Sequence, residues 1–303
     1  MTRIVFLVGP TAVGKSALAQ ALAEEDGGAI LSLDAMQVYQ GLDIGTGKPT
    51  AAERARVPHG GLDLAPWWER FDTARYLAAA AAFLKQEAGR PLYVVGGTGL
   101  YFRALTQGLS PAPAAPPALR QELAALPPQT LRERLRRLDP DQPEGFDWNN
   151  PRRVQRALEV IEATGRSLRA WQAEQAPPLL PPGSYRAFFL QRERDDLRAL
   201  IAARVEAMLA AGWAGEVETL LKERGGVALR ACPALGYGSL ASWIEAGSRE
   251  QDLPAVGQKI VDETRQYARR QLTWFKREAT LESLMIAPGE RLRVTVPRLR
   301  AAA

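Results

Sequence analysis

The chain has 303 residues, 46% of them hydrophobic, which can fill one large domain or two modest ones. A single cysteine and a single histidine exclude an internal disulfide and a zinc site built from cysteine and histidine. No stretch approaches the ~18 uninterrupted apolar residues of a membrane span, so we expect a cytoplasmic protein that does not bind a membrane. The net charge of +5 points only weakly to a polyanionic partner.

The first predicted elements are a strand over residues 3–8 and a helix over residues 17–23. Between them, Gly9-Pro10-Thr11-Ala12-Val13-Gly14-Lys15-Ser16 has the spacing of a phosphate-binding loop. Its glycines let backbone N–H groups turn inward, and the positive end of the following helix points at the bound anion. We predict that a polyphosphate or diphosphate binds there and that the Ser16 hydroxyl ligates Mg²⁺. The predicted diphosphate-binding residues are Gly9, Thr11, Ala12, Val13, Gly14, Lys15 and Ser16.

Further apolar runs alternate with helical patterns, which favours a mostly parallel sheet flanked by helices. The next two predicted strands cover residues 29–33 and 91–95, with a helix over 73–88 between them. In such sheets ligands bind beyond the carboxyl ends of the strands. The segments that follow the three strands should therefore converge on one cleft; they are 9–16, 34–37 and 96–101.

Two proline-rich stretches, 111–117 and 177–182, bracket a helical region. Proline stops helices and stiffens linkers, so this region is predicted to be an inserted helical subdomain. A strand over 185–190 and a helix over 196–211 then rejoin the core. The predicted fold is α/β, a P-loop NTPase-like, mostly parallel sheet flanked by helices, with a core of residues 1–110 and 184–303 and an insertion over 111–183.

Asp34 ends the second predicted strand and should face the phosphate-loop cleft. It could cap a helix or bind a Mg²⁺-bound water, or it could act as a hydrogen-bond acceptor or general base for a nucleophile entering the cleft. The third strand ends in Gly96-Gly97, where many nucleoside-triphosphate hydrolases have a metal-associated aspartate. The chain therefore lacks part of the usual set of catalytic residues of such a hydrolase.

Two predicted helices carry clusters of basic residues. The helix over 259–277 has apolar and aromatic residues near one face and arginines largely outside it, and a second basic helix begins near Asn149. Ordinary amphipathic helices with a solvated face explain much of this pattern. Basic groups interleaved with aromatics also suit phosphate contacts and base stacking in RNA, and two such clusters favour RNA.

Taken together, six segments resemble the ordered signature of tRNA dimethylallyltransferases of the bacterial type, also called tRNA isopentenyltransferases. The segments span nearly the whole chain and comprise residues 9–16, 34–39, 44–49, 96–101, 153–160 and 266–275. The resemblance implies transfer of a dimethylallyl group from dimethylallyl diphosphate to N6 of the adenine immediately 3′ of the anticodon. It also implies Mg²⁺ as cofactor and the tRNA anticodon arm as partner, and we expect a monomer.

The resemblance implies roles for particular residues. Asp34 would accept the proton of the adenine amino group, Thr98 and Arg204 would complete the anion site, and Gln37 could bind the base edge. The implied tRNA-binding residues are Asp34, Ala35, Met36, Gln37, Thr98, Arg152, Arg153, Val154, Gln155, Arg156, Arg269 and Arg270.

Two other functions stay open at this point. A small-molecule kinase would use the same loop to hold ATP and would phosphorylate its substrate without tRNA. A nucleotide-switched RNA-binding protein would bind tRNA in a manner that depends on ATP or GTP, without any prenyl transfer.

Overall fold

The computed structural model describes residues 3–142, 145–174 and 176–290. The chain forms two compact units, the core unit (Met1–Ala104 and Leu180–Ala303) and the helical unit (Leu105–Leu179). The sequence analysis placed the corresponding boundaries at 111 and 183. Residues 291–303, which it assigned to the core, lie outside the described residues.

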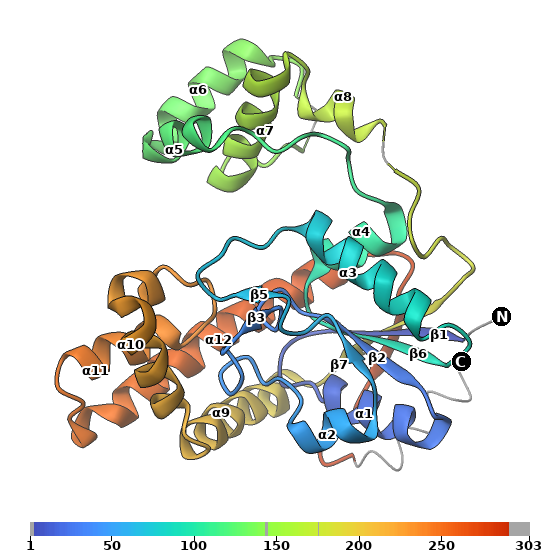
Figure 1. Ribbon diagram of the computed structural model, residues 1–303, viewed down its shortest axis with the longest axis vertical. Coiled ribbons are helices and arrows are strands. Elements are labelled where there is room, and N and C mark those ends of the chain that lie inside the picture. The colour runs from blue at the N-terminus through green and yellow to red at the C-terminus, as the bar shows by residue number, and fades with distance from the viewer. Residues whose placement is uncertain (1–2, 143–144, 175, 291–303) are drawn as a thin grey trace. The chain divides into compact units, whose positions relative to one another are not determined.

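The core unit is built on a parallel sheet that, within the described residues, has six strands in the order β4-β2-β6-β1-β7-β8 (Figure 1). The strands are β1 (Ile4–Val8), β2 (Ala29–Leu33), β4 (His59–Gly60), β6 (Leu92–Gly96), β7 (Arg186–Gln191) and β8 (Glu282–Met285). A parallel pair of two-residue strands lies beside it, β3 (Tyr39–Gln40) and β5 (Ala65–Pro66).

The central strands β1, β2 and β6 are almost completely buried, because helices cover both faces of the sheet. These are the strands that continuous apolar runs predict, and β2 has the predicted bounds. The edge strands β4 and β8 were not predicted. One has only two residues and the other is mostly exposed and polar, so neither shows an apolar run.

Helices flank the sheet, with α1 and α3 on opposite sides of it (Figure 1). The core-unit helices are α1 (Lys15–Asp26), α2 (Ala51–Arg56), α3 (Thr73–Gln86), α4 (Gly99–Gln107), α9 (Arg194–Ala210), α10 (Trp213–Arg230), α11 (Tyr237–Glu245) and α12 (Leu253–Phe275), and a 3-10 turn precedes α12 at Glu250–Asp252. Helix α12 packs its C-terminal end on the sheet through Phe275, whose ring contacts those of Phe102 and Phe189. No helix in the described ranges is both long and apolar enough to cross a membrane.

The helical unit contains α5 (Pro117–Ala125), α6 (Pro128–Leu138), α7 (Pro151–Thr164) and α8 (Leu168–Gln172). Proline occupies the first turn of α5, α6 and α7, where its missing N–H costs no hydrogen bond. Asn150 caps α7 by accepting a hydrogen bond from the Arg153 N–H. An apolar core joins the helices and is made of Leu123, Leu131, Leu135, Val154, Ala157 and Leu158.

Candidate functional site

A cavity of about 550 Å³ opens at the carboxyl ends of the central strands. The three segments that the sequence analysis expected to converge all contribute to it, and α9 and α12 close it from the other side. Its lining includes Thr11, Ala12, Gly14, Lys15, Ser16, Asp34, Gln37, Thr46, Glu53, Gly96, Gly97, Leu200, Arg204, Tyr267 and Gln271. A volume of this size suits a small organic ligand.

The phosphate loop (residues 9–16) is a strand-to-helix turn. Its backbone favours glycine at two positions, Gly9 and Gly14. A Cβ atom on Gly9 would lie 2.6 Å from the Leu190 carbonyl oxygen. Gly14 has a φ of 107° and precedes α1 without any side-chain cap. The first N–H groups of α1 are therefore open to an anion, which the positive end of the helix attracts. Val13 is fully buried and does not line the cavity, so it can contact a diphosphate only through its backbone.

Two cations share the cavity. The buried Lys15 donates from Nζ to the carbonyl oxygens of Gly9 at 3.0 Å and Pro10 at 2.6 Å. Burial, and to a smaller extent the charge of Arg204, lowers the pKa of Lys15 to about 7, against the opposing effect of Asp34. Burial also lowers the pKa of Arg204. No carboxylate in the described part of the chain forms an ion pair with Arg204. A multiply charged anion bound in the cavity would stabilise the charged forms of both side chains.

Asp34 holds its own turn with one oxygen and leaves the other open. Its Oδ1 accepts a hydrogen bond from the Met36 N–H at 2.8 Å, so it stabilises a turn and not, as one alternative had it, the start of a helix. No described residue donates a hydrogen bond to Oδ2. The carboxylate lines the same cavity as Lys15 and Arg204, so a free acceptor faces the anion site.

Thr98 does not line the cavity. Its Oγ1 accepts a hydrogen bond from the Ala35 N–H at 3.0 Å, and its own N–H donates to the Leu33 carbonyl at 3.1 Å. These bonds tie the end of β6 to the residues on either side of Asp34. The predicted contact of this hydroxyl with phosphate therefore has no geometric support here, and the side chain holds the backbone around Asp34.

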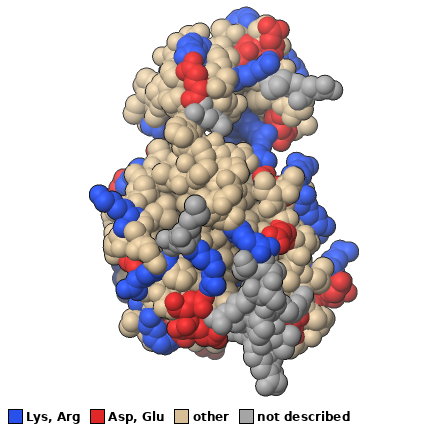
Figure 2. All heavy atoms as spheres, turned by 90° about the vertical axis from the view of Figure 1, so that its right-hand side faces the viewer, with Lys and Arg blue, Asp and Glu red and all other residues tan. Residues whose placement is uncertain are grey.

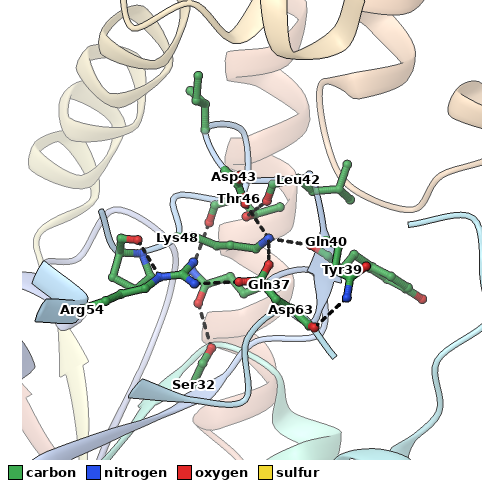
Figure 3. A network of polar contacts seen from close by, with 12 residues as sticks. Ser32, Gln37, Tyr39, Gln40, Leu42, Asp43, Thr46, Lys48, Arg54 and Asp63 are labelled. Atoms are coloured by element: carbon green, nitrogen blue, oxygen red, sulfur yellow. Dashed lines mark hydrogen bonds and ion pairs between the residues drawn. The ribbon is translucent and has the colours of Figure 1, made fainter. Parts of the chain in front are cut away.

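The Gln37 amide is occupied by the protein itself (Figure 3). Ser32 donates to its Oε1 at 2.8 Å, and its Nε2 donates to the carbonyl oxygens of Thr46 at 3.2 Å and Gly47 at 3.0 Å. Both amide hydrogens are thus used. A hydrogen bond from Gln37 to a base edge would require one of these contacts to open.

Lys48 anchors the loop of residues 43–48 from within (Figure 3). Its side chain is 1% exposed and donates at 2.6 Å to Asp43, Asp63 and the Tyr39 carbonyl. The opposing charges and hydrogen bonds compensate for the burial of the ammonium group. The sequence analysis included residues 44–49 in the family signature but assigned no role to Lys48.

Helix α10 anchors the same loop from outside. The Glu216 carboxylate accepts hydrogen bonds from the N–H groups of Asp43 at 3.0 Å and Ile44 at 2.7 Å, and from the Tyr237 hydroxyl at 2.6 Å. The loop backbone then packs directly on Arg204, because a Cβ atom on Gly47 would lie 2.2 Å from its guanidinium. Glu216 lies in a helix with no recognisable motif, and no signal in the sequence pointed to it.

The predicted tRNA-binding residues fall into two groups. Arg152 and Arg153 on α7, and Arg269 and Arg270 on α12, are exposed. The others are engaged or buried. Gln155 donates to Glu159, Arg156 donates to the carbonyl oxygens of Ala112 and Pro113, and Ala35 and Met36 form the half-buried turn after β2.

The structure corrects the prediction that Val154 binds tRNA. Its side chain is 1% exposed and belongs to the apolar core of the helical unit, which contradicts a contact of this side chain with RNA. The 3.6-residue period of α7 turns this residue inward while its neighbours Arg152 and Arg153 point to solvent.

The donor set at the phosphate loop fits Mg²⁺. The Ser16 hydroxyl and the Asp34 carboxylate both line the cavity, and oxygen is the ligand that Mg²⁺ prefers. No group of three or more His, Cys, Asp and Glu residues in the described ranges could hold a metal ion by itself. Only a site completed by substrate phosphates and water therefore suits these residues.

A phosphate loop between β1 and α1, at the carboxyl edge of a parallel sheet with covered faces, defines a P-loop-type α/β protein. The model of the IPP transferase family matches residues 37–278, and that of the isopentenyl transferase family matches residues 2–57. The chain belongs to the IPP transferase family.

Relatives with known names cover nearly all of this chain. It is 44% identical over 285 residues to the tRNA dimethylallyltransferase of Rhodopseudomonas palustris. The aligned region covers 91% of this chain and 88% of that protein. The chain is 40% identical over 280 residues to the tRNA dimethylallyltransferase of Methylacidiphilum infernorum. That aligned region covers 92% of this chain and 84% of that protein.

Solved structures are similar in fold. The full-length tRNA isopentenylpyrophosphate transferase of Bacillus halodurans matches with a TM-score of 0.69 at 32% identity, covering 100% of this chain and 95% of that one. A eukaryotic dimethylallyltransferase acting on tRNA matches with a TM-score of 0.83 at 24% identity, covering 100% and 78% respectively, and supports the fold alone.

Proposed function

We propose that the chain is a tRNA dimethylallyltransferase, which transfers a dimethylallyl group from dimethylallyl diphosphate to N6 of the adenine immediately 3′ of the anticodon. The observation that carries this proposal is one cavity in which a phosphate loop and two cations face a carboxylate with a free oxygen. Family membership and the names of the relatives agree with it.

The diphosphate would bind the phosphate loop. The open N–H groups of α1 would donate to its oxygens, and Lys15 would exchange its bonds to loop carbonyls for bonds to phosphate. Arg204 would contact the same anion from α9. Because charge builds on the diphosphate as the carbon–oxygen bond breaks, these donors would stabilise the transition state more than the ground state. Ser16 would hold Mg²⁺, which when bound neutralises part of this charge.

Asp34 would accept the proton of the nucleophile. The lone pair of the adenine amino group is delocalised into the ring, so the amine is weak until it loses a proton. The new N–C bond forms at N6, the electron pair of the broken C–O bond leaves with the diphosphate, and the proton of N6 passes to Asp34. The free Oδ2 provides the acceptor.

Exposed arginines would hold the tRNA anticodon arm. Arg152 and Arg153 in the helical unit and Arg269 and Arg270 in the core unit would contact phosphates. On the face shown in Figure 2, basic and acidic side chains are interspersed over the core unit, so individual arginines rather than net charge carry this part of the proposal. The proposed location is the cytoplasm, and the proposed form is a monomer.

The test is incubation of the protein with unmodified tRNA and dimethylallyl diphosphate, followed by mass analysis of the nucleosides. We expect one dimethylallyl group on the adenine next to the anticodon, and none on a tRNA that carries another base there. Phosphorylation of a small molecule by ATP without tRNA would instead identify a kinase. Binding of tRNA that depends on ATP or GTP, without prenylation, would identify a nucleotide-switched RNA-binding protein.

A further inference from the structure

We infer that Gln271 on α12 is a positioning residue, whose side-chain amide sets the distance between the phosphate loop and Asp34. The inference deepens the proposed function and rests on it. No step of the transfer described above uses this residue.

Gln271 joins two loops that are remote in sequence. Its Oε1 accepts a hydrogen bond from the Thr11 N–H of the phosphate loop at 2.9 Å, across 260 residues of chain. Its Nε2 donates to the Gly97 carbonyl after β6 at 3.1 Å, across 174 residues. The residue is 6% exposed, so loss of the amide would leave the Gly97 carbonyl, whose bond is buried, and the half-buried Thr11 N–H without this partner.

The backbone at Gly97 is shaped around this amide. A Cβ atom on Gly97 would lie 1.9 Å from the Gln271 Nε2, closer than any real contact. Any larger side chain here would displace the amide, so glycine is what lets the amide approach the loop this closely. Gly97, the second glycine of the pair that stands in place of a metal-associated aspartate, thus makes room for a side chain from α12.

Thr98, the residue after Gly97, continues the connection to Asp34. Its N–H bonds to Leu33 and its hydroxyl accepts from Ala35, so it holds both neighbours of Asp34. The hydrogen bonds therefore run from the loop that would hold the leaving group, through Gln271 and the turn after β6, to the carboxylate that would take the proton. A shift of about 1 Å between these two ends is enough to lower a rate about 10²-fold.

Gln271 takes up a loop N–H rather than presenting one to the ligand. Loss of its amide should thus affect the rate at saturating substrate more than the affinity for diphosphate. A residue that only stabilises the fold would lower the unfolding temperature and leave the rate per folded molecule unchanged. These two expectations separate positioning from a purely structural role.

The first experiment compares Gln271→Met with Gln266→Met, the same substitution at an exposed position of the same helix. We expect Gln271→Met to lower the single-turnover rate at saturating tRNA and dimethylallyl diphosphate about 10- to 100-fold, with a much smaller change in diphosphate affinity. A rate equal to that of Gln266→Met would overturn the inference. So would a rate loss that a weaker diphosphate affinity explains fully.

The second experiment does not depend on transfer activity. Amide hydrogen exchange in Gln271→Met should become faster at Thr11, whose hydrogen-bond acceptor is removed, and also at Ala35, which Gln271 reaches only through Gly97 and Thr98. Unchanged exchange at Ala35 would overturn the inference even if Thr11 changed. Absence of prenylation by the unsubstituted protein would reject the proposed function, and exchange at Ala35 would still test the connection.

Discussion

The core unit and the helical unit use polar residues in different ways. In the core unit, polar side chains such as Gln37, Lys48 and Gln271 bond to backbone groups and fix the shape of the cavity. In the helical unit an apolar cluster holds the helices, and arginines such as Arg152 and Arg153 stay exposed. Substitutions of these polar side chains in the core unit should therefore change chemistry, and those of exposed arginines in either unit should change RNA binding alone.

The largest expected effect is at Asp34. Asp34→Asn keeps the shape and the turn-capping oxygen but removes the basicity, so we expect single-turnover transfer to fall about 10²–10⁴-fold. Binding of tRNA and of dimethylallyl diphosphate, measured separately, should persist. Asp195→Asn is the matched control, because the Asp195 side chain is 92% exposed. A near-normal rate would eliminate Asp34 as the base.

A smaller loss is expected at the phosphate loop. Lys15→Ala removes a buried cation that would contact phosphate, and we expect diphosphate binding to weaken about 10- to 100-fold, in line with hydrogen bonds to charged groups. Ser16→Ala should instead raise the Mg²⁺ concentration needed for activity. Calorimetric titration with diphosphate, at several Mg²⁺ concentrations, checks both. If both variants bound diphosphate normally, the assignment of the loop would be wrong.

Diphosphate affinity should also depend on pH through Lys15. In the free protein its pKa is about 7, and a bound anion would raise it, because the anion favours the charged ammonium. Binding above pH 7 therefore takes up a proton, and the affinity should fall as pH rises, by at most about tenfold per unit. Calorimetry in buffers of different ionisation enthalpy measures the uptake. Lys15→Met should show only the proton exchange of the diphosphate itself, and equal uptake in both proteins would contradict the prediction.

The smallest single effects are expected at the exposed arginines. Replacing Arg152, Arg153, Arg269 or Arg270 with alanine should flatten the log–log salt dependence of tRNA binding by roughly one unit or a little less for each phosphate that is no longer neutralised. Arg166→Ala is a control, since Arg166 already pairs with Glu174. Diphosphate binding should not change. Four unaltered slopes would show that these arginines are ordinary solvated surface residues that do not contact tRNA phosphates.

Arg156 sharpens the comparison within one helix. It donates to the carbonyl oxygens of Ala112 and Pro113, whereas no residue that the structure describes pairs with the guanidinium of the exposed Arg152 or Arg153. We expect Arg156→Ala to change the salt slope less than Arg153→Ala does. The same tRNA-binding titration at several salt concentrations measures both.

Local patterns explain what could be predicted. The apolar run at 29–33 and the glycines at 9 and 14 act within a few residues, so β2 and the loop before α1 were predictable from sequence. Val154 was misassigned because a basic stretch was treated as one contact surface, although each residue of a helix points in its own direction. The helical period would have identified this residue as buried.

The sequence by itself determined the strand, loop and helix of the phosphate site, the parallel strands whose ends converge on it and, through its motifs, the family. Tertiary structure alone decided that Gln37 bonds to its own loop, that Arg204 packs against Gly47, and that Glu216 and Gln271 hold the cavity. The physical reason is distance along the chain. A hydrogen bond between residues 260 positions apart depends on the packing of whole helices on the sheet, and no local pattern of residues records it.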